Sequence, residues 1–442
     1  MENIYNLAIG ISGLILTAKF HYNKYFILLL LFFWYGFFQY LMGFYFDFFK
    51  IFLFLFSFFL LGIYPTKGYD TYDRLINLLF VLFSVSFWLS YYLNPFSIIS
   101  AGSQYFLKYV IPILLYHWYK SFKDSPALQE KYVYWIAFLV LSQCLFSLFK
   151  IGTIGFREMT VGSMQWDGGQ IAVGFPLAAL LFYWNQKSGK LSRNDWLLLF
   201  SFLLISVASV KRTPVFLFPV FLFLLSIWVT QNKALLISIL QYTPVVLLLL
   251  YLGLRLNPSL NPENKVWGSF DLKYAINYAM GYQFGIRDGQ RQNDIIDTYP
   301  SSSLALFFPD TYQGESLGET LFGHGMYQYK FLSNDQFNAY YAGPLPIMSK
   351  SVLSGAFIDV KSFGILCFVL FLSINIIIVM QTPGRMMWVV MSFYLYVYFF
   401  YTSNVFTQPP ILLTILPVIF NSKLNRPLKT AKTPKMKISI KF

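Results

Sequence analysis

A succession of apolar runs, each close to the length of one membrane crossing, constrains this chain more than any other feature. A helix needs about 20 apolar residues to span the hydrocarbon of a bilayer. Such runs lie near residues 4–17, 25–42, 48–64, 75–93, 100–118, 132–149, 169–185, 195–210, 213–230, 234–253, 362–380, 385–403 and 407–420. The sequence therefore predicts an all-α polytopic membrane protein with about 12 or 13 transmembrane helices.

The composition agrees with a membrane protein and excludes a soluble one. The 442 residues are 57% hydrophobic and only 12% charged, whereas soluble domains carry about 25% charge. Aromatic residues make up 21% of the chain, which suits lipid-facing surfaces and interfacial belts. The first apolar run follows Glu2 and lacks a small-residue cleavage site, so we expect it to be retained as a membrane segment.

The distribution of Lys and Arg predicts the orientation. Most of the 33 basic residues lie in one alternate set of short links and in the segment after residue 420, and cytoplasmic links carry such an excess. Because the basic residues do not form one patch, the net charge of +14 does not predict a nucleic-acid partner. We expect the C-terminus inside, with the basic tail touching anionic membrane lipid.

These assignments divide the chain into four parts. Residues 1–253 hold transmembrane helices one to ten, and residues 254–361 form a large, partly helical loop on the non-cytoplasmic side. Residues 362–420 hold the last three helices, and residues 421–442 form a basic cytoplasmic tail. Both cysteines, Cys144 and Cys367, lie in apolar runs, and no His and carboxylate set has metal-ligand spacing. The sequence predicts no metal and no cofactor.

A basic turn between two apolar runs on the outer side is the first candidate site. Lys211 and Arg212 break the orientation rule there, and arginine at membrane depth usually faces a cavity or an ionic partner. Its planar fork also suits phosphate oxygens. The alternative is a pair of side chains that extend to the interface and have no further role.

Three further candidates lie in outer segments. Tyr274, Tyr278 and Tyr282 share one helical face and lead to Arg287 and Arg291, a pattern that could stack sugar rings and hold a phosphate. An interfacial amphipathic helix is the equal alternative.

His324, between two glycines, is a candidate base, although a loop histidine without a role is as common. Arg157 lies in a glycine-rich outer link, where irregular backbone would line a cavity or form a plain exterior loop.

Three short motifs, taken in order, resemble the O-antigen polymerase and ligase superfamily of the Wzy and WaaL types. They are a glycine-rich outer link like GSMQWDGGQIAVG, a Ser-Arg turn like Ser209 to Arg212, and a large outer loop late in the chain. That loop ends in a Gly-x-Gly like Gly323 to Gly325, followed by an acidic residue and a glycine like Asp359 and Gly364.

The resemblance implies a GT-C-like bacterial glycosyltransferase that uses undecaprenyl-diphosphate-linked oligosaccharide. It implies that Arg212 and either Arg287 or Arg291 bind the lipid diphosphate, without a metal. The sequence has Lys350, rather than the His-containing pair of ligase-like members, shortly before the next helix, and Asp359 lies further from Gly364 than in the family. These departures favour a polymerase over a ligase.

The expected function is therefore polymerisation of lipid-linked repeats at the outer face of the bacterial cytoplasmic membrane. The expected partners are the lipid-linked oligosaccharide, membrane lipid and a chain-length regulator protein. Two alternatives stay open: an O-antigen ligase, and a flippase or other transporter of lipid-linked oligosaccharide. A transporter would be expected to have short outer loops and intramembrane charges, whereas this chain concentrates its polar residues outside.

Overall fold

The described part of the chain is helical throughout. The computed structural model describes residues 29–30, 32–36, 70–93, 101–102, 105–122, 125–155, 162–164, 171–187, 192–209, 213–225, 243–277, 306, 312, 315–325, 355–400 and 405–421. These residues contain α-helices with short 3-10 and π segments and no strand, as the sequence predicts at the level of fold class. The elements are α5 (Thr71–Leu93), η2 (Phe106–Val110), α7 (Ile111–Phe122), α8 (Pro126–Ile154), α9 (Ile171–Gln186), α10 (Arg193–Ala208), α11 (Thr213–Leu224), α13 (Thr243–Leu256), η4 (Pro258–Leu260), α16 (Leu317–Phe322), α18 (Gly355–Met380), α19 (Met386–Phe400), η9 (Val405–Thr407) and α20 (Pro409–Phe420).

Three described helices are long and apolar enough to cross a membrane. They cover Thr71–Leu93, Pro126–Thr153 and Gly355–Met380, and shorter apolar helices cover Ile171–Gln186, Met386–Phe399 and Pro409–Phe420. Each predicted run from 75–93 onward contains a described helix. The predicted runs 4–17 and 48–64 lie outside the described residues, and of 25–42 only 29–30 and 32–36 are described.

Helices extend into both ends of the predicted loop 254–361. α13 ends at Leu256, and α18 begins at Gly355 rather than at 362. The first residues of α18 include Asp359 and Lys361, which made this stretch look like loop in the sequence. These two charged residues can belong to the helix because α18 bends at Gly364. The part of α18 before the bend therefore need not run in the membrane-crossing direction.

α9 is the central helix of the bundle. Every residue from Ile171 to Asn185 is buried, which is typical of a helix that is apolar all round and surrounded by others. At Gly174 a Cβ atom would lie 2.8 Å from Ile411 Cδ1 of α20. The absence of a side chain at this position lets α9 and α20 pack closely, as small residues do between membrane helices.

Aromatic rings join α5, η2 and α18. Ring centroids lie 4.8 Å apart for Phe83 and Tyr109, 4.9 Å for Tyr109 and Phe371, and 4.8 Å for Phe87 and Phe363. Such pairs contribute about 0.5–1.5 kcal/mol each beyond their burial. Lipid tails are as apolar as these rings, so packing and not the hydrophobic effect holds these helices together.

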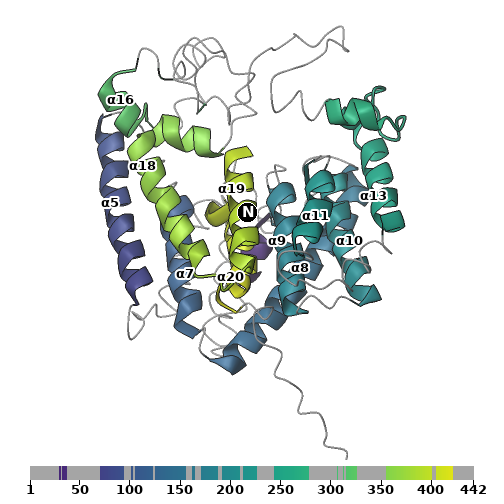
Figure 1. Cartoon of the computed structure of the whole chain (residues 1–442), viewed down its shortest axis with the longest axis horizontal. Helices are drawn as coiled ribbons and strands as arrows, with labels where there is room; N and C mark the ends of the chain where they lie inside the picture. Colours follow the sequence, from purple (N-terminus) through teal and green to yellow (C-terminus); the bar gives the residue numbers. More distant parts are fainter. Residues whose placement is uncertain are drawn as a thin grey trace, which may run out of the picture.

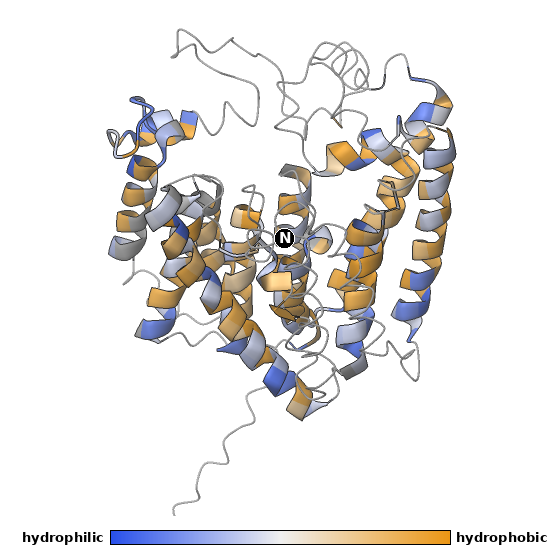
Figure 2. Ribbon diagram, turned by 180° about the vertical axis from the view of Figure 1, so that it is seen from behind, coloured by the Kyte–Doolittle hydropathy of each residue, from blue (hydrophilic) through white to orange (hydrophobic). Residues whose placement is uncertain are grey.

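The links gather at two ends of the bundle. The beginnings of α5 and α8 and the ends of α7 and α18 lie at one end, and α16 lies at the other, above α5 and beside the beginning of α18 (Figure 1). Apolar residues dominate the middle of the helices, and the most hydrophilic ones lie toward the ends (Figure 2). Which face of a membrane each end meets stays a prediction.

The bend at Gly364 is held by α16 and the turn that follows it. Gly364 has φ +82°, a conformation that favours glycine, and it interrupts the helical hydrogen bonds of α18. The N–H groups of His324 and Gly325 donate to the carbonyls of Lys361 and Ser362, at 2.8 and 3.0 Å. The bent backbone therefore finds its partners in a segment that lies far away in the sequence.

We predict that Gly364→Ala lowers the stability of the protein in detergent. Alanine in this conformation costs about 1–3 kcal/mol, and its Cβ would also lie 2.1 Å from the carbonyl oxygen of Leu321. Thermal unfolding would measure the loss. Gly152→Ala is the matched control, because no atom lies within 4 Å of a Cβ there and alanine favours a helix by up to about 1 kcal/mol. Equal unfolding temperatures for the two variants would contradict this account of the bend.

Candidate functional site

Asp359 is the centre of the candidate site at the α16 end of the bundle. The carboxylate of this partly buried residue accepts hydrogen bonds from Tyr398 Oη at 2.8 Å and Tyr109 Oη at 3.3 Å. The positive charge of Lys108 also acts on it. Three elements, η2, α18 and α19, therefore converge on one carboxylate.

A π-helical segment presents two of these partners. η2 covers Phe106–Val110, and it carries both Lys108 and Tyr109 before the chain continues into α7. π-helical turns are rare and are often found at functional sites, because the wider turn redirects neighbouring side chains.

Aromatic rings surround these partners of Asp359. Phe363 lies against Tyr109 with ring centroids 6.0 Å apart, and Phe368 stacks on Tyr398 at 5.9 Å. The apolar surroundings strengthen the hydrogen bonds to the carboxylate.

A buried ionic cluster connects residues 315–325 to α18. Glu315 Oε1 accepts a hydrogen bond from His324 Nε2 at 2.9 Å and pairs with Lys361 Nζ. Lys361 Nζ also lies 4.6 Å from the centre of the Tyr312 ring. The side chains of His324, Lys361 and Glu315 are 5%, 3% and 8% exposed, so the cluster is closed to solvent and holds residues 315–325 against α18.

The short helix α16 orients this cluster. Ser316 Oγ accepts from the Glu319 N–H at 3.2 Å, and Glu319 Oε2 accepts from the Ser316 N–H at 2.8 Å. This reciprocal pair is a capping box, which satisfies two amides that a helix start leaves open. Glu319 Oε1 also lies 3.8 Å from His324 Nδ1, so the helix start faces the ionic cluster.

The pKa of the Glu315 carboxyl is lowered by its partners. Burial raises this pKa, but the hydrogen bonds from His324 and Lys361 and the positive charge of Lys361 lower it by more. Glu315 is therefore held as a carboxylate. The pKa of Glu319 is also lowered, first by the backbone hydrogen bond from Ser316.

The structure describes three of the residues singled out from the sequence. Asp359 and His324 lie at the same end of the bundle, where His324 contacts the backbone and, through Glu315, the side chain of Lys361. Tyr274 lies elsewhere, on the helical turn that begins at Asp271, whose Oδ1 accepts from the Tyr274 N–H at 2.8 Å. The others lie outside the described residues: Arg157, Lys211, Arg212, Tyr278, Tyr282, Arg287, Arg291 and Lys350.

The family-like motif elements meet in space. A Cβ atom at Gly323 would lie 2.5 Å from the backbone of Ser362, and one at Gly364 would lie 2.1 Å from the backbone of Leu321. The Gly-x-Gly turn and the glycine after Asp359 thus pack backbone against backbone. This contact gives a physical reason for the two glycines.

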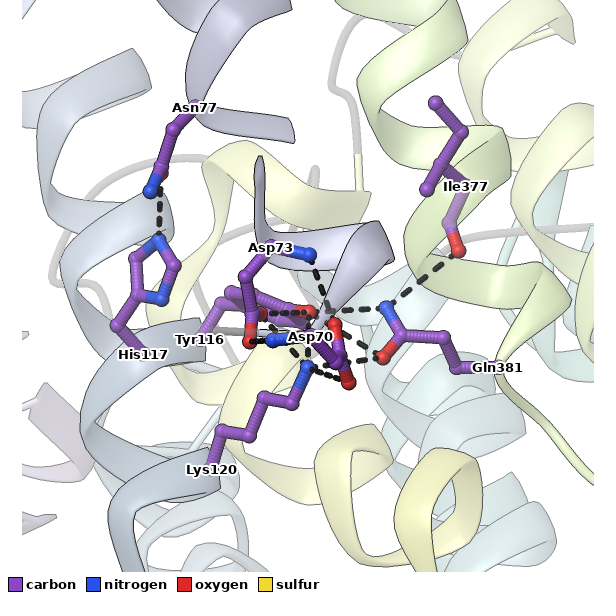
Figure 3. Close-up of polar contacts among 8 residues, drawn as sticks. All are labelled: Asp70, Asp73, Asn77, Tyr116, His117, Lys120, Ile377 and Gln381. Carbon is purple, nitrogen blue, oxygen red and sulfur yellow. Dashed lines mark hydrogen bonds and ion pairs between the residues drawn. The ribbon is translucent and has the colours of Figure 1, made fainter. Parts of the chain in front are cut away.

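The opposite end holds a polar cluster that the sequence did not reveal. Lys120 Nζ lies 2.6 Å from Asp70 Oδ2 and 2.7 Å from Asp73 Oδ1, and Tyr116 Oη donates to Asp73 at 3.0 Å (Figure 3). Gln381 Nε2 donates to Tyr116 Oη at 2.9 Å. α5, α7 and the end of α18 are tied together by these contacts.

A second contact lies beside this cluster. His117 Nε2 is 2.8 Å from Asn77 Oδ1, so it joins α7 to α5 one turn away (Figure 3).

Sequence spacing offered a signal for this polar cluster. Asp70 and Asp73 are three residues apart at a helix start, and Tyr116 and Lys120 are four apart at a helix end, so each pair shares a helix face. Nothing in one sequence indicates that the two pairs meet.

No protein-family model matches this chain, and no curated protein or solved structure matches it either. The resemblance to the O-antigen polymerase and ligase superfamily stays a prediction, and the site is interpreted from its own geometry.

We predict that Lys120→Met destabilises the folded protein strongly, because it leaves Asp73, which is fully buried, without a positive partner. Removing one member of a buried ion pair costs about 3–5 kcal/mol. Thermal unfolding in detergent would measure the loss, and adding Asp73→Asn should restore part of it. The exposed Lys131 offers the control Lys131→Met, which should cost about 0–1 kcal/mol. Equal losses for both single variants would disprove a structural role for the cluster.

We also predict an acid-sensitive contribution from Glu315. Its folded pKa is lowered relative to an unfolded value of about 4.3. The carboxylate therefore stabilises the fold above that value, and this stabilisation is lost as the pH falls through the folded pKa. Unfolding temperatures between about pH 6 and pH 3 should fall more steeply for the wild-type protein than for Glu315→Gln, which is less stable already at pH 6. Parallel curves would refute this assignment.

Proposed function

We propose that this chain is a polysaccharide polymerase, which joins undecaprenyl-diphosphate-linked oligosaccharide repeats at the outer face of a bacterial cytoplasmic membrane. The product class is an O-antigen, capsule or exopolysaccharide. The observation that supports a surface reaction is the position of the ionisable groups in the described helices.

The charged side chains avoid the middle of the bundle. α9, α11, α19 and α20 contain no Asp, Glu, Lys or Arg. The charged residues of α5, α7, α8, α10, α13 and α18 lie within about two turns of a helix end. Lys108 lies on the π-helical segment beside Asp359.

A transporter is expected to hold ionisable groups near the membrane midplane. The arrangement in the described helices favours chemistry at the membrane surface, which is where a lipid-linked substrate carries its diphosphate and its sugars.

The proposed reaction is a glycosyl transfer with diphosphate as the leaving group. A hydroxyl oxygen of one lipid-linked repeat forms a bond to the anomeric carbon at the reducing end of another chain. The bond between that carbon and the diphosphate oxygen breaks, and its electron pair leaves with the lipid diphosphate. The proton of the attacking hydroxyl passes to a carboxylate, and we assign this role to Asp359.

Asp359 has the geometry that such a base requires. Two tyrosine hydroxyls fix the orientation of its carboxylate, and the residue as a whole is partly buried. A base must be positioned before its proton affinity matters. His324 and Lys361 are buried in a closed cluster, which favours a positioning role for His324 over direct contact with substrate.

Basic residues would bind and stabilise the leaving group. Arg212, Arg287 and Arg291 are proposed to contact the diphosphate, because guanidinium groups bind phosphate oxygens bidentately and stabilise charge that develops in the transition state. Lys211, Arg157 and Lys350 would add positive charge around the same group. Tyr274, Tyr278 and Tyr282 are proposed to stack against the sugars.

We predict that Arg212→Ala abolishes polymer while membrane insertion stays normal. Loss of a charge-stabilising donor typically reduces turnover by about 10²–10³-fold. Polymer length, measured on gels of surface polysaccharide, is the readout. Asp359→Asn should also abolish polymer, since an amide cannot accept the proton. Arg74→Ala, an exposed residue at the other end of the bundle, should make polymer of normal length. Long polymer from the Arg212→Ala variant would contradict the proposal.

A cell that lacks the protein separates the three candidate functions. Single repeats at the cell surface would indicate a polymerase, and free polymer without its acceptor would indicate a ligase. Repeats trapped on the inner side would indicate a flippase. Mass analysis of the accumulated lipid-linked material distinguishes these outcomes, and only the first supports the proposed function.

A further inference from the structure

The end of α13 carries a small folded unit that packs on itself. We call residues 251–277 the α13 cap. Its apolar interior consists of Leu254, Leu260 and Ala275, with Leu250 of α13 packed against them, and it is separate from the main core of the bundle. It projects at the same end of the bundle as α16 (Figure 1).

Two polar side chains hold the cap in shape. Asn261 Nδ2 donates to the carbonyls of Asn257 and Lys265, each at 2.9 Å. Arg255 donates from Nε to the Gly268 carbonyl at 2.8 Å and from Nη1 to Tyr251 Oη at 2.7 Å. The backbone turn after α13 is therefore braced on both sides. Such bracing fixes the direction of the side chains it carries.

This rigid cap exposes a group of large apolar side chains. The exposed residues, which we call the apolar patch, are Val266 at 46%, Trp267 at 51%, Phe270 at 46%, Leu272 at 40% and Ile276 at 47%. A concentration of exposed apolar side chains on one short segment marks an interaction surface.

The backbone of Trp267 is strained. It has φ +67°, a left-handed conformation that is uncommon for a bulky residue. Strained backbone of this kind persists only where the surroundings enforce it, and it points to function. Here the guanidinium of Arg255 lies 4.7 Å from the centre of the Trp267 ring, within the range of a cation–π interaction.

We propose that the apolar patch docks into the interface of the bilayer that the helices cross. The patch follows directly on α13, whose Leu247 and Leu248 are themselves 57% and 54% exposed and face lipid in a membrane bundle. Tryptophan is enriched at the membrane interface. The exposed Lys273 adjoins the patch in sequence, where its ammonium group can reach lipid phosphates, whereas Lys265 pairs with Glu263 at 2.5 Å.

Docking of the patch also orients Tyr274. Successive helical residues are rotated by about 100°, so Tyr274 lies roughly 160–200° from Leu272 and Ile276 around the helix. With those two side chains in the interface, Tyr274 faces away from the lipid. This favours a sugar-binding face over a membrane belt for Tyr274. The docking itself does not rest on the proposed function, because it concerns lipid and not substrate.

The test measures whether the apolar patch contacts lipid or water in the full-length protein. A background with Cys144→Ser and Cys367→Ala removes the native thiols, and Phe270→Cys then carries an environment-sensitive fluorophore in a lipid nanodisc. Glu263→Cys is the matched control, because Glu263 is an exposed polar residue of the same cap. Ile276→Cys provides a second patch position if the first variant does not fold.

Lipids with a nitroxide near the head group should quench the label at 270 severalfold more than the label at 263. Aqueous iodide should quench them in the opposite order. Lipids with a nitroxide at the chain end should quench the label at 270 less, because interfacial side chains enter only about 5–10 Å into the boundary. Strong iodide quenching at both 270 and 276 would overturn the proposal, and so would protection of both labels from iodide and from nitroxide lipids.

Discussion

The end of the bundle that carries α16 depends on how the backbone hydrogen bonds that α18 loses at Gly364 are replaced. Unpaired carbonyls are costly at membrane depth, and irregular backbone is tolerated there only where protein or water supplies partners. The N–H groups of His324 and Gly325 supply them to Lys361 and Ser362. With this contact in place, the first part of α18 can turn aside from the membrane-crossing direction and carry Asp359 to its tyrosine partners.

The ionic cluster of Glu315, His324 and Lys361 fixes the register of that backbone contact. Backbone hydrogen bonds alone would accept other residues in place of 324 and 325, whereas the pairing of Glu315 with Lys361 and His324 admits one register. Burying these charges has a desolvation cost that their attraction roughly offsets. The cluster fixes residues 315–325 beside the helix that carries Asp359.

The apolar runs predicted α9, α10, α19 and α20 to within three residues at each end, because a span has a length that hydropathy reports directly. The start of α18 was predicted too late, since Asp359 and Lys361 resemble loop residues until their partners are known. The glycines at 323 and 364 were recognised as a motif, but their mutual contact was not predictable from one sequence. The π-helical turn at Lys108 and the contact between Lys120 and Asp73 depend likewise on how helices pack.

The two ends of the bundle differ in the partners of their charged side chains. At the end where α5 begins, Lys120 lies between Asp70 and Asp73, and Tyr116 and Gln381 complete the network. The ammonium compensates one of the two carboxylates, and Tyr116 Oη donates a hydrogen bond to the buried Asp73. At the end that carries α16, Lys361 pairs with Glu315, whereas Asp359 accepts hydrogen bonds from the neutral hydroxyls of Tyr109 and Tyr398 and feels the charge of Lys108. The proposed role of Asp359 as a base rests on this difference between the two ends.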